Sequence, residues 1–131
     1  MTKEHKYKTG KICFGKSCFE VEIARTLMEK ARGLSFRKSL LENSGMFFAF
    51  WFQWRHAFWM KNTLMPLDII WLDKNYIVVD IARDSKPCTG LLCPAIIPSK
   101  PAKYVLEINA GLSKKMSIEV GSKAEFAPIT I

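Results

Sequence analysis

Hydrophobic and polar residues alternate along several short segments, in the pattern typical of strands. Phe19, Val21 and Ile23 alternate with glutamates, which predicts a strand with one solvent-exposed face. Before it, residues 11–14 and 17–24 read as the arms of a hairpin. Further strands are expected over residues 45–50, 56–60, 68–73, 76–83, 103–110 and 117–126, with a long proline-containing loop over 84–101.

One short helix is expected, over about residues 27–32. Thr26 and Glu29 have the spacing of a capping box, and Gly33 is typical of a helix end. Many short strands with one helix predict a mainly β fold, a compact β-barrel or jelly-roll-like sandwich. The alternative is an α+β sheet with the helix packed on one face.

Length and composition indicate one globular domain. The chain has 131 residues, of which 49% are hydrophobic and 24% charged. It contains no repeat or linker, so residues 11–131 are expected to form a single β-rich domain after a basic N-terminal tip, 1–10, that can be disordered. No apolar run reaches the roughly 18 residues of a membrane span, so no transmembrane segment is expected.

The net charge of +8 is unevenly distributed, with half of the excess in residues 1–16. Because no nucleic-acid motif accompanies this charge, no specific nucleic-acid partner is expected. The N-terminus lacks an apolar leader, which favours a cytoplasmic protein, or an extracytoplasmic one if the chain is a trimmed mature form. A monomer or weak dimer is expected. Fifteen lysines beside one glutamine and four asparagines are typical of a thermophile.

Four cysteines form two pairs with identical spacing. Cys13 and Cys18 flank a Gly15-Lys16 turn of type II′, which places them opposite each other, with Cα atoms about 4.5 Å apart. Cys88 and Cys93 lie in a loop that is bounded by prolines, and a glycine lies between them. Two local disulfides, Cys13–Cys18 and Cys88–Cys93, are favoured over a four-cysteine zinc site or free thiols, so no metal is expected.

Aromatic residues are concentrated in one part of the chain. Residues 47–59 carry eight of the 16 aromatic side chains. Most of them are expected in the core. Residues 51–55 fall where a hairpin tip should be polar, so this aromatic tip either packs on the molecule itself or contacts a protein partner or a membrane surface.

Polar residues interrupt the apolar segments that follow. Lys61, Asn62, Thr63 and Asp68 must find partners or line a cavity, and Lys61 with Asp68 forms either a structural ion pair or the polar anchors of a pocket. Glu107 would add a second carboxylate if its strand face points into the cavity. Asp68 and Glu107 are therefore weak candidates for acid–base catalysis. The alternative is that Glu107 pairs with an arginine, such as Arg32 or Arg37.

Several enzyme classes are disfavoured. The chain has no G-x-S-x-G motif, P-loop, G-x-G-x-x-G motif or H-E-x-x-H motif. Nucleotide binding and triad hydrolysis therefore rank low, and no cofactor is expected.

Several motifs in order resemble a known family. They are Ala31-Arg-Gly-Leu34, Gly45-Met-Phe-Phe-Ala-Phe50, Phe58-Trp-Met-Lys-Asn-Thr63, Pro66-Leu-Asp-Ile-Ile70 and Tyr104-Val-Leu-Glu-Ile-Asn-Ala-Gly111. The chain resembles domain-of-unknown-function family 192 (DUF192), an uncharacterised prokaryotic family. The resemblance implies a compact, mostly β fold with one short helix. It implies no biochemical activity, because none is established for the family.

The sequence favours a binding module for a small polar ligand, a saccharide or an anion. Two alternatives are an interaction protein that uses the aromatic tip and a hydrolase-type enzyme that uses Asp68 and Glu107, with Lys61 as electrostatic stabiliser. The expected ligand-binding cleft is formed by Arg37, Trp59, Lys61, Asn62, Thr63, Asp68 and Glu107.

Overall fold

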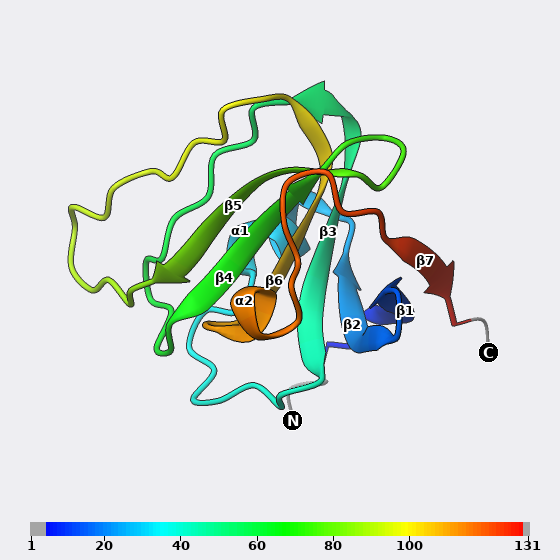
Figure 1. Ribbon diagram of the computed structural model, residues 1–131. Coiled ribbons are helices and arrows are strands. Elements are labelled where there is room, and N and C mark those ends of the chain that lie inside the picture. Colours follow the sequence, from blue (N-terminus) through cyan, green and yellow to red (C-terminus); the bar gives the residue numbers. More distant parts are fainter. Residues whose placement is uncertain (1–4, 130–131) are drawn as a thin grey trace.

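The seven strands of the fold form one sheet, which carries two short helices (Figure 1). These elements come from a computed structural model, which describes residues 5–129; residues 1–4 of the expected basic tip lie outside the described range. The sheet order is β5-β4-β6-β3-β2-β1-β7. The elements are β1 (Lys8–Phe14), β2 (Ser17–Ala24), α1 (Leu27–Arg32), β3 (Ser44–Trp54), β4 (Leu67–Leu72), β5 (Val78–Ser85), β6 (Ala102–Asn109), α2 (Leu112–Lys115) and β7 (Glu125–Pro128).

The expected mainly β class is confirmed. Strands β2 and β3 pair in parallel, and the other neighbouring strands pair antiparallel. Because β5 and β7 are the two edges of the described sheet and do not pair with each other, the sheet is not closed into a barrel.

Helix α1 begins and ends where the sequence predicts. The Thr26 hydroxyl accepts a hydrogen bond from the Glu29 N–H at 3.1 Å, and the Glu29 carboxylate accepts one from the Thr26 N–H at 3.1 Å. This reciprocal pair is the expected capping box. Gly33 ends the helix with a positive φ of 50°, which glycine adopts without the strain that a Cβ would add. The second helix, α2, was not expected.

The core lies on both faces of the sheet. Neighbouring residues of a strand point to opposite faces, so Ile70 and Leu72 of β4 join one apolar cluster and Ile69 and Trp71 join the other. Leu112 of α2 belongs to the first cluster, and Leu34, just after α1, belongs to the second. The two helices therefore cover opposite faces.

Three expected boundaries are wrong. β3 continues through Trp54, so residues 51–54 are the end of a strand and not a hairpin tip. Residues 56–60 form no strand: Phe58 makes only an isolated bridge to Ile96, whose neighbours Pro94 and Pro98 lack the N–H that a continuous ladder needs. Residues 117–124 form turns and irregular backbone with one isolated bridge, because positive φ angles at Ser117 and Gly121 interrupt an extended backbone, and only residues 125 and 126 of the expected strand belong to one, β7.

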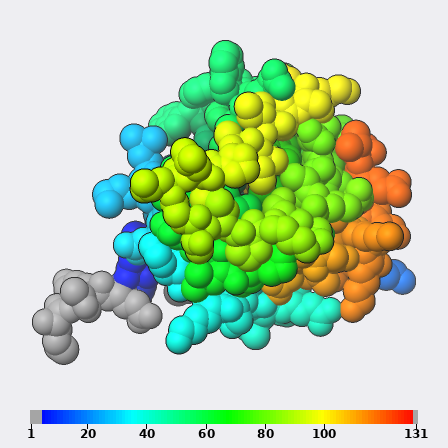
Figure 2. Space-filling model, turned by 90° about the vertical axis from the view of Figure 1, so that its left-hand side faces the viewer, coloured from blue at the N-terminus to red at the C-terminus, as the bar shows by residue number. Residues whose placement is uncertain are grey.

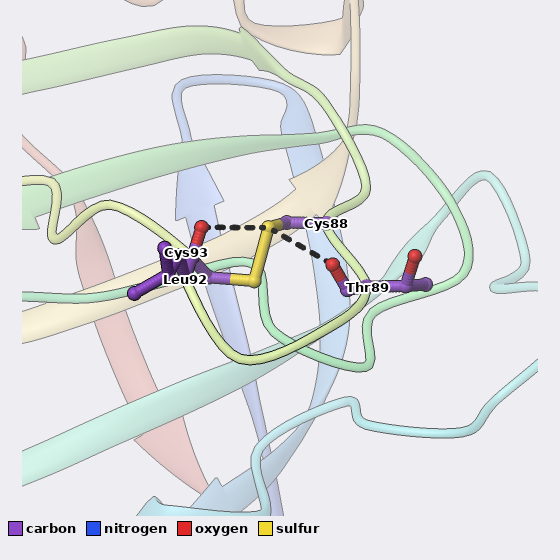
Figure 3. The surroundings of a disulfide bond; sticks show 4 residues. All are labelled: Cys88, Thr89, Leu92 and Cys93. Atoms are coloured by element: carbon purple, nitrogen blue, oxygen red, sulfur yellow. Dashed lines mark hydrogen bonds between the residues drawn. A yellow bond between two sulfur atoms is a disulfide. The ribbon is translucent and has the colours of Figure 1, made fainter.

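Both expected disulfides are at bonding distance. Cys13 pairs directly with Cys18, their Cα atoms 4.0 Å apart, and Gly15 has the positive φ of 61° that a type II′ turn requires at that position. Cys88 and Cys93 close the second loop, with Cα atoms 5.9 Å apart (Figure 3). Neither the zinc site nor free thiols is found, since all four cysteines are paired. Among residues 5–129, no helix is long and apolar enough to cross a membrane.

Candidate functional site

A pocket of about 280 Å³ lies on the α1 side of the sheet. Its walls come from the last turn of α1 and the residues after it, from β3, from the segment 57–63 and from one position of β6. Four of the seven expected ligand-binding residues line it: Trp59, Lys61, Thr63 and Glu107. Phe48 and Phe50 of β3 supply much of the apolar wall.

Glu107 is the buried carboxyl of this pocket. It lies opposite Met46 across the β3–β6 ladder, and only 4% of its surface is exposed. Burial raises the pKa of its carboxyl to about 8, because the charged form loses its hydration. Among residues 5–129 no hydrogen bond or ion pair engages this carboxyl. At neutral pH it is mostly protonated, and can both donate and accept a hydrogen bond.

The segment that carries Lys61 and Thr63 is held by the disulfide loop. The Asn62 N–H donates to the Cys88 carbonyl at 2.9 Å, and the Cys88 N–H donates to the Met60 carbonyl at 3.2 Å. The Cys88–Cys93 bond closes the loop next to this contact (Figure 3). The pocket wall is thus tied to a covalently closed loop.

Cationic groups surround the pocket. The Lys61 ammonium lies 5.2 Å from the centre of the Trp59 ring, and the Lys30 ammonium lies 4.5 Å from the centre of the Phe50 ring. Burial lowers the pKa of Lys30, because its charged form is partly desolvated. Arg32 adds a third cation to the lining.

Arg37 and Asn62 lie in an adjacent hollow. Residues 31, 32 and 35 line both hollows, which makes them neighbours along the end of α1. The Arg37 guanidinium is paired with the Glu22 carboxylate, and its charge is therefore partly neutralised. Arg37 and Asn62 were expected in the same cleft as Glu107, but they line a separate hollow beside the pocket.

Asp68 is not part of the pocket. It is fully buried and accepts hydrogen bonds from the Asp84, Gly111 and Ser113 N–H groups and from the Ser113 hydroxyl, at 2.6–3.1 Å. It fixes the start of α2 and the end of β5. The expected Lys61–Asp68 ion pair does not form among the described residues.

Asp68 and Glu107 are not brought together. Asp68 pairs with Ile108 across the β4–β6 ladder, while Glu107 pairs with Ile69. Directly opposite residues share a face and adjacent ones do not, so the two carboxyls point to opposite sides of the sheet. The paired-carboxylate arrangement of the hydrolase hypothesis is therefore unavailable to them.

Sequence reasoning missed the contribution of α1 to the pocket. Lys30 and Ser35 were not candidates, and Arg32 was expected only as a partner for Glu107. Cations in the last turn of a helix are common because they complement the helix dipole, so the sequence alone gives them no binding signal. The motif Ala31-Arg-Gly-Leu34 was the one available hint.

The comparisons with known proteins identify the family. Residues 11–126 match the DUF192 family model, described as an "Uncharacterized ACR". The chain belongs to this family, as its motifs predicted.

The relatives include archaeal and bacterial proteins. A UPF0127 protein of Pyrococcus abyssi is 34% identical over 82% of this chain and 86% of its own length. A crystal structure of a protein of unknown function from Novosphingobium aromaticivorans has 36% identity and a TM-score of 0.79, covering 89% of this chain and 83% of that one. A crystal structure from Sinorhizobium meliloti, described as a candidate transcription regulator, has 26% identity and a TM-score of 0.85, covering 95% and 98%.

Proposed function

We propose that this protein is a binding module for a small polar ligand, a saccharide, held in the pocket between α1, β3 and β6. The Glu107 carboxyl carries the proposal. It is buried at the pocket, engages no described residue and stands among further hydrogen-bonding groups. A hydroxyl of a ligand in the pocket can exchange hydrogen bonds with this carboxyl, as donor or as acceptor.

The other lining residues fit the same ligand class. A saccharide offers hydroxyl groups around its rim and apolar C–H faces. The Thr63 hydroxyl and the Lys61 ammonium can bond the hydroxyls, while the half-exposed Trp59 ring can pack on a C–H face. An anion is the competing ligand, because Lys30, Lys61 and Arg32 bring three cations to the lining.

A titration series separates these ligands. Neutral monosaccharides, a uronate and inorganic phosphate are titrated into the full chain, with calorimetry and amide chemical shifts as readouts. Saccharide binding that perturbs residues 57–63 supports the proposal. If only phosphate binds, the ligand of the pocket is an anion and the saccharide proposal is wrong. No saturable response at millimolar ligand would overturn the proposal.

A matched pair of variants locates the site. Glu107→Leu removes the polar group while filling the space, and we expect it to weaken saccharide binding at least tenfold, about 1.4 kcal/mol. Glu125→Leu makes the same change at an exposed position of β7 and should leave binding unchanged. Equal affinities in the two variants would place the ligand elsewhere.

The end of β3 supports a second candidate function, docking on an anionic membrane surface. Trp51, Phe52 and Trp54, the aromatic strand end, are 89%, 60% and 64% exposed. Most of the surface of these three side chains is therefore free, although the Phe52 ring also contacts the His56 ring, 5.6 Å away between ring centres. Exposed tryptophans favour the interface between apolar and aqueous phases, and the net charge of +8 favours anionic lipid.

A further inference from the structure

Another hollow, of about 390 Å³, lies on the face of the sheet opposite to the saccharide pocket and to the hollow beside it. Phe47 and Tyr104 line it, whereas their near neighbours Phe48 and Glu107 line the first pocket. The alternation of side chains along β3 and β6 explains this division. The volume falls within the roughly 300–1,000 Å³ typical of small-molecule sites.

We propose that this hollow is a binding site for a planar aromatic anion, an aryl carboxylate or aryl phosphate. The first support is a wall of four aromatic rings from four parts of the chain. Phe47 lies 5.2 Å from Tyr104 and 4.7 Å from Phe126 between ring centres, and Tyr76 lies 4.7 Å from Tyr104. The planes of these pairs differ by 8–19°, so the rings stack on one another with nearly parallel faces. Phe47 is fully buried within this stack, whereas the rings of Tyr76, Tyr104 and Phe126 are only partly buried. A flat ligand ring can stack against such faces.

The hydroxyl groups at this wall leave one donor free. The Tyr76 hydroxyl donates to the Tyr104 oxygen at 3.4 Å. Burial and this hydrogen bond raise the pKa of Tyr76 to about 12, so it stays protonated at neutral pH. No described group accepts the Tyr104 proton, which can therefore be donated to an anionic oxygen of the ligand.

The charges of the hollow are all of one sign. Lys8 of β1 and Arg25, just after β2, line it, and no carboxylate does. Among the described residues neither cation has an ion-pair partner. The Lys103 ammonium lies 5.7 Å from the centre of the Tyr104 ring and adds to the positive potential. Parallel aromatic faces, a free phenol donor and unpaired cations together match a flat anion better than a neutral or aliphatic ligand.

The test uses four probes with the full chain. Benzoate and phenyl phosphate carry both required features, benzamide lacks the charge, and cyclohexanecarboxylate lacks the planar ring. Binding is followed by chemical shifts of the tyrosine rings and by calorimetry. We expect benzoate or phenyl phosphate to bind at least tenfold more tightly than both controls. Whichever of these two binds more tightly identifies the carboxylate or the phosphate as the preferred anion.

Variants separate this site from the first pocket. Arg25→Gln and Tyr104→Phe should each weaken binding of the aromatic anion about threefold to tenfold. Lys11→Gln removes an exposed cation of β1 outside the hollow and should leave the affinity unchanged, as should Glu107→Leu on the opposite face. If neither benzoate nor phenyl phosphate binds more tightly than benzamide, or if binding is lost in Glu107→Leu but not in Arg25→Gln, the proposal is overturned.

Discussion

At the scale of single residues, the buried carboxyls of Asp68 and Glu107 have different roles because they have different surroundings. Asp68 accepts four hydrogen bonds and is satisfied by the fold. Glu107 has no described hydrogen-bond partner, and burial raises the pKa of its carboxyl. A buried carboxyl with a raised pKa and no described hydrogen-bond partner marks a candidate binding site more clearly than a carboxylate that is fully hydrogen-bonded.

The first prediction concerns the pH dependence set by Glu107. Its pKa is about 8 in the folded chain, against 4.5 for an exposed carboxyl. Between these values the unfolded chain releases a proton that the folded chain keeps, so the contribution of Glu107 to stability is greatest below pH 4.5 and falls as pH rises to 8. We expect Glu107→Gln to remove this loss, on the order of a few kcal/mol.

Urea unfolding at the acidic and alkaline ends of that range measures the effect. Glu42→Gln, at an exposed carboxylate that meets Lys115, serves as the control and should keep the wild-type pH dependence. An identical pH dependence in Glu107→Gln and wild type would show that Glu107 titrates normally in the folded chain.

The second prediction distinguishes a structural from a pocket residue. Asp68→Asn replaces a carboxylate oxygen by an amide that cannot accept from Ser113, Gly111 and Asp84 together, and we expect a loss of about 2–4 kcal/mol in unfolding free energy. Lys61→Ala, at the pocket wall, should cost within about 1 kcal/mol. Thermal and urea unfolding of both variants measure the difference. Comparable losses would mean that Lys61 is also structural.

At the scale of elements, the two disulfides offer a matched comparison. Each joins cysteines five positions apart, so loop closure should stabilise both to a similar extent, about 2 kcal/mol. Of the four cysteines, all of which lie in the described range, only Cys88 makes backbone hydrogen bonds to the segment 60–62. We therefore expect Cys88→Ser/Cys93→Ser to weaken saccharide binding several-fold, because the backbone under Lys61 loosens.

The control is Cys13→Ser/Cys18→Ser, which should lose similar stability and keep its affinity for the saccharide. Urea unfolding and calorimetry are measured on both double variants. If both lose affinity equally, the effect is one of global stability and the disulfide loop does not support the pocket.

Local sequence signals predicted those elements whose structure is decided locally. The capping box at Thr26 and Glu29 fixed the start of α1, and the Gly15-Lys16 turn set the register of the β1–β2 hairpin. The segment 56–60 has an equally apolar pattern, but its partners lie in a loop with prolines, and only isolated bridges form. Such partners are tertiary information, which local periodicity does not contain.

The candidate site was predicted in the same uneven way. The motif around Trp59, Lys61 and Thr63 identified one wall of the pocket, and the alternation along β6 placed Glu107 and Asn109 on one face. Asp68 was misassigned because its partners, Ser113 above all, belong to a helix that the sequence did not reveal. The sequence therefore predicted which polar residues are important, but not which of them form hydrogen bonds within the folded chain.

At the scale of the whole molecule, the sheet separates three surfaces. One face carries the saccharide pocket, the other carries the aromatic hollow, and the aromatic strand end projects at the end of β3. Figure 1 shows this strand end beside the return of the long loop into β6, and Figure 2 shows that loop covering one side of the molecule. A membrane bound at the aromatic strand end leaves the saccharide pocket open only if it does not cover α1, which forms one wall of that pocket.

The last prediction tests membrane docking by the aromatic strand end. Trp51→Ser/Trp54→Ser should abolish co-sedimentation with vesicles of phosphatidylcholine and phosphatidylserine, because tryptophan rings supply the apolar contact and the basic surface supplies only a salt-sensitive attraction. Leu91→Ser/Leu92→Ser removes two apolar side chains of the long loop that are at least as exposed as the tryptophans, and it should leave binding intact. Equal losses in the two double variants would indicate adsorption through any exposed apolar residue. Unchanged binding in both would assign the interaction to charge alone, and the aromatic strand end would then be a contact for another protein.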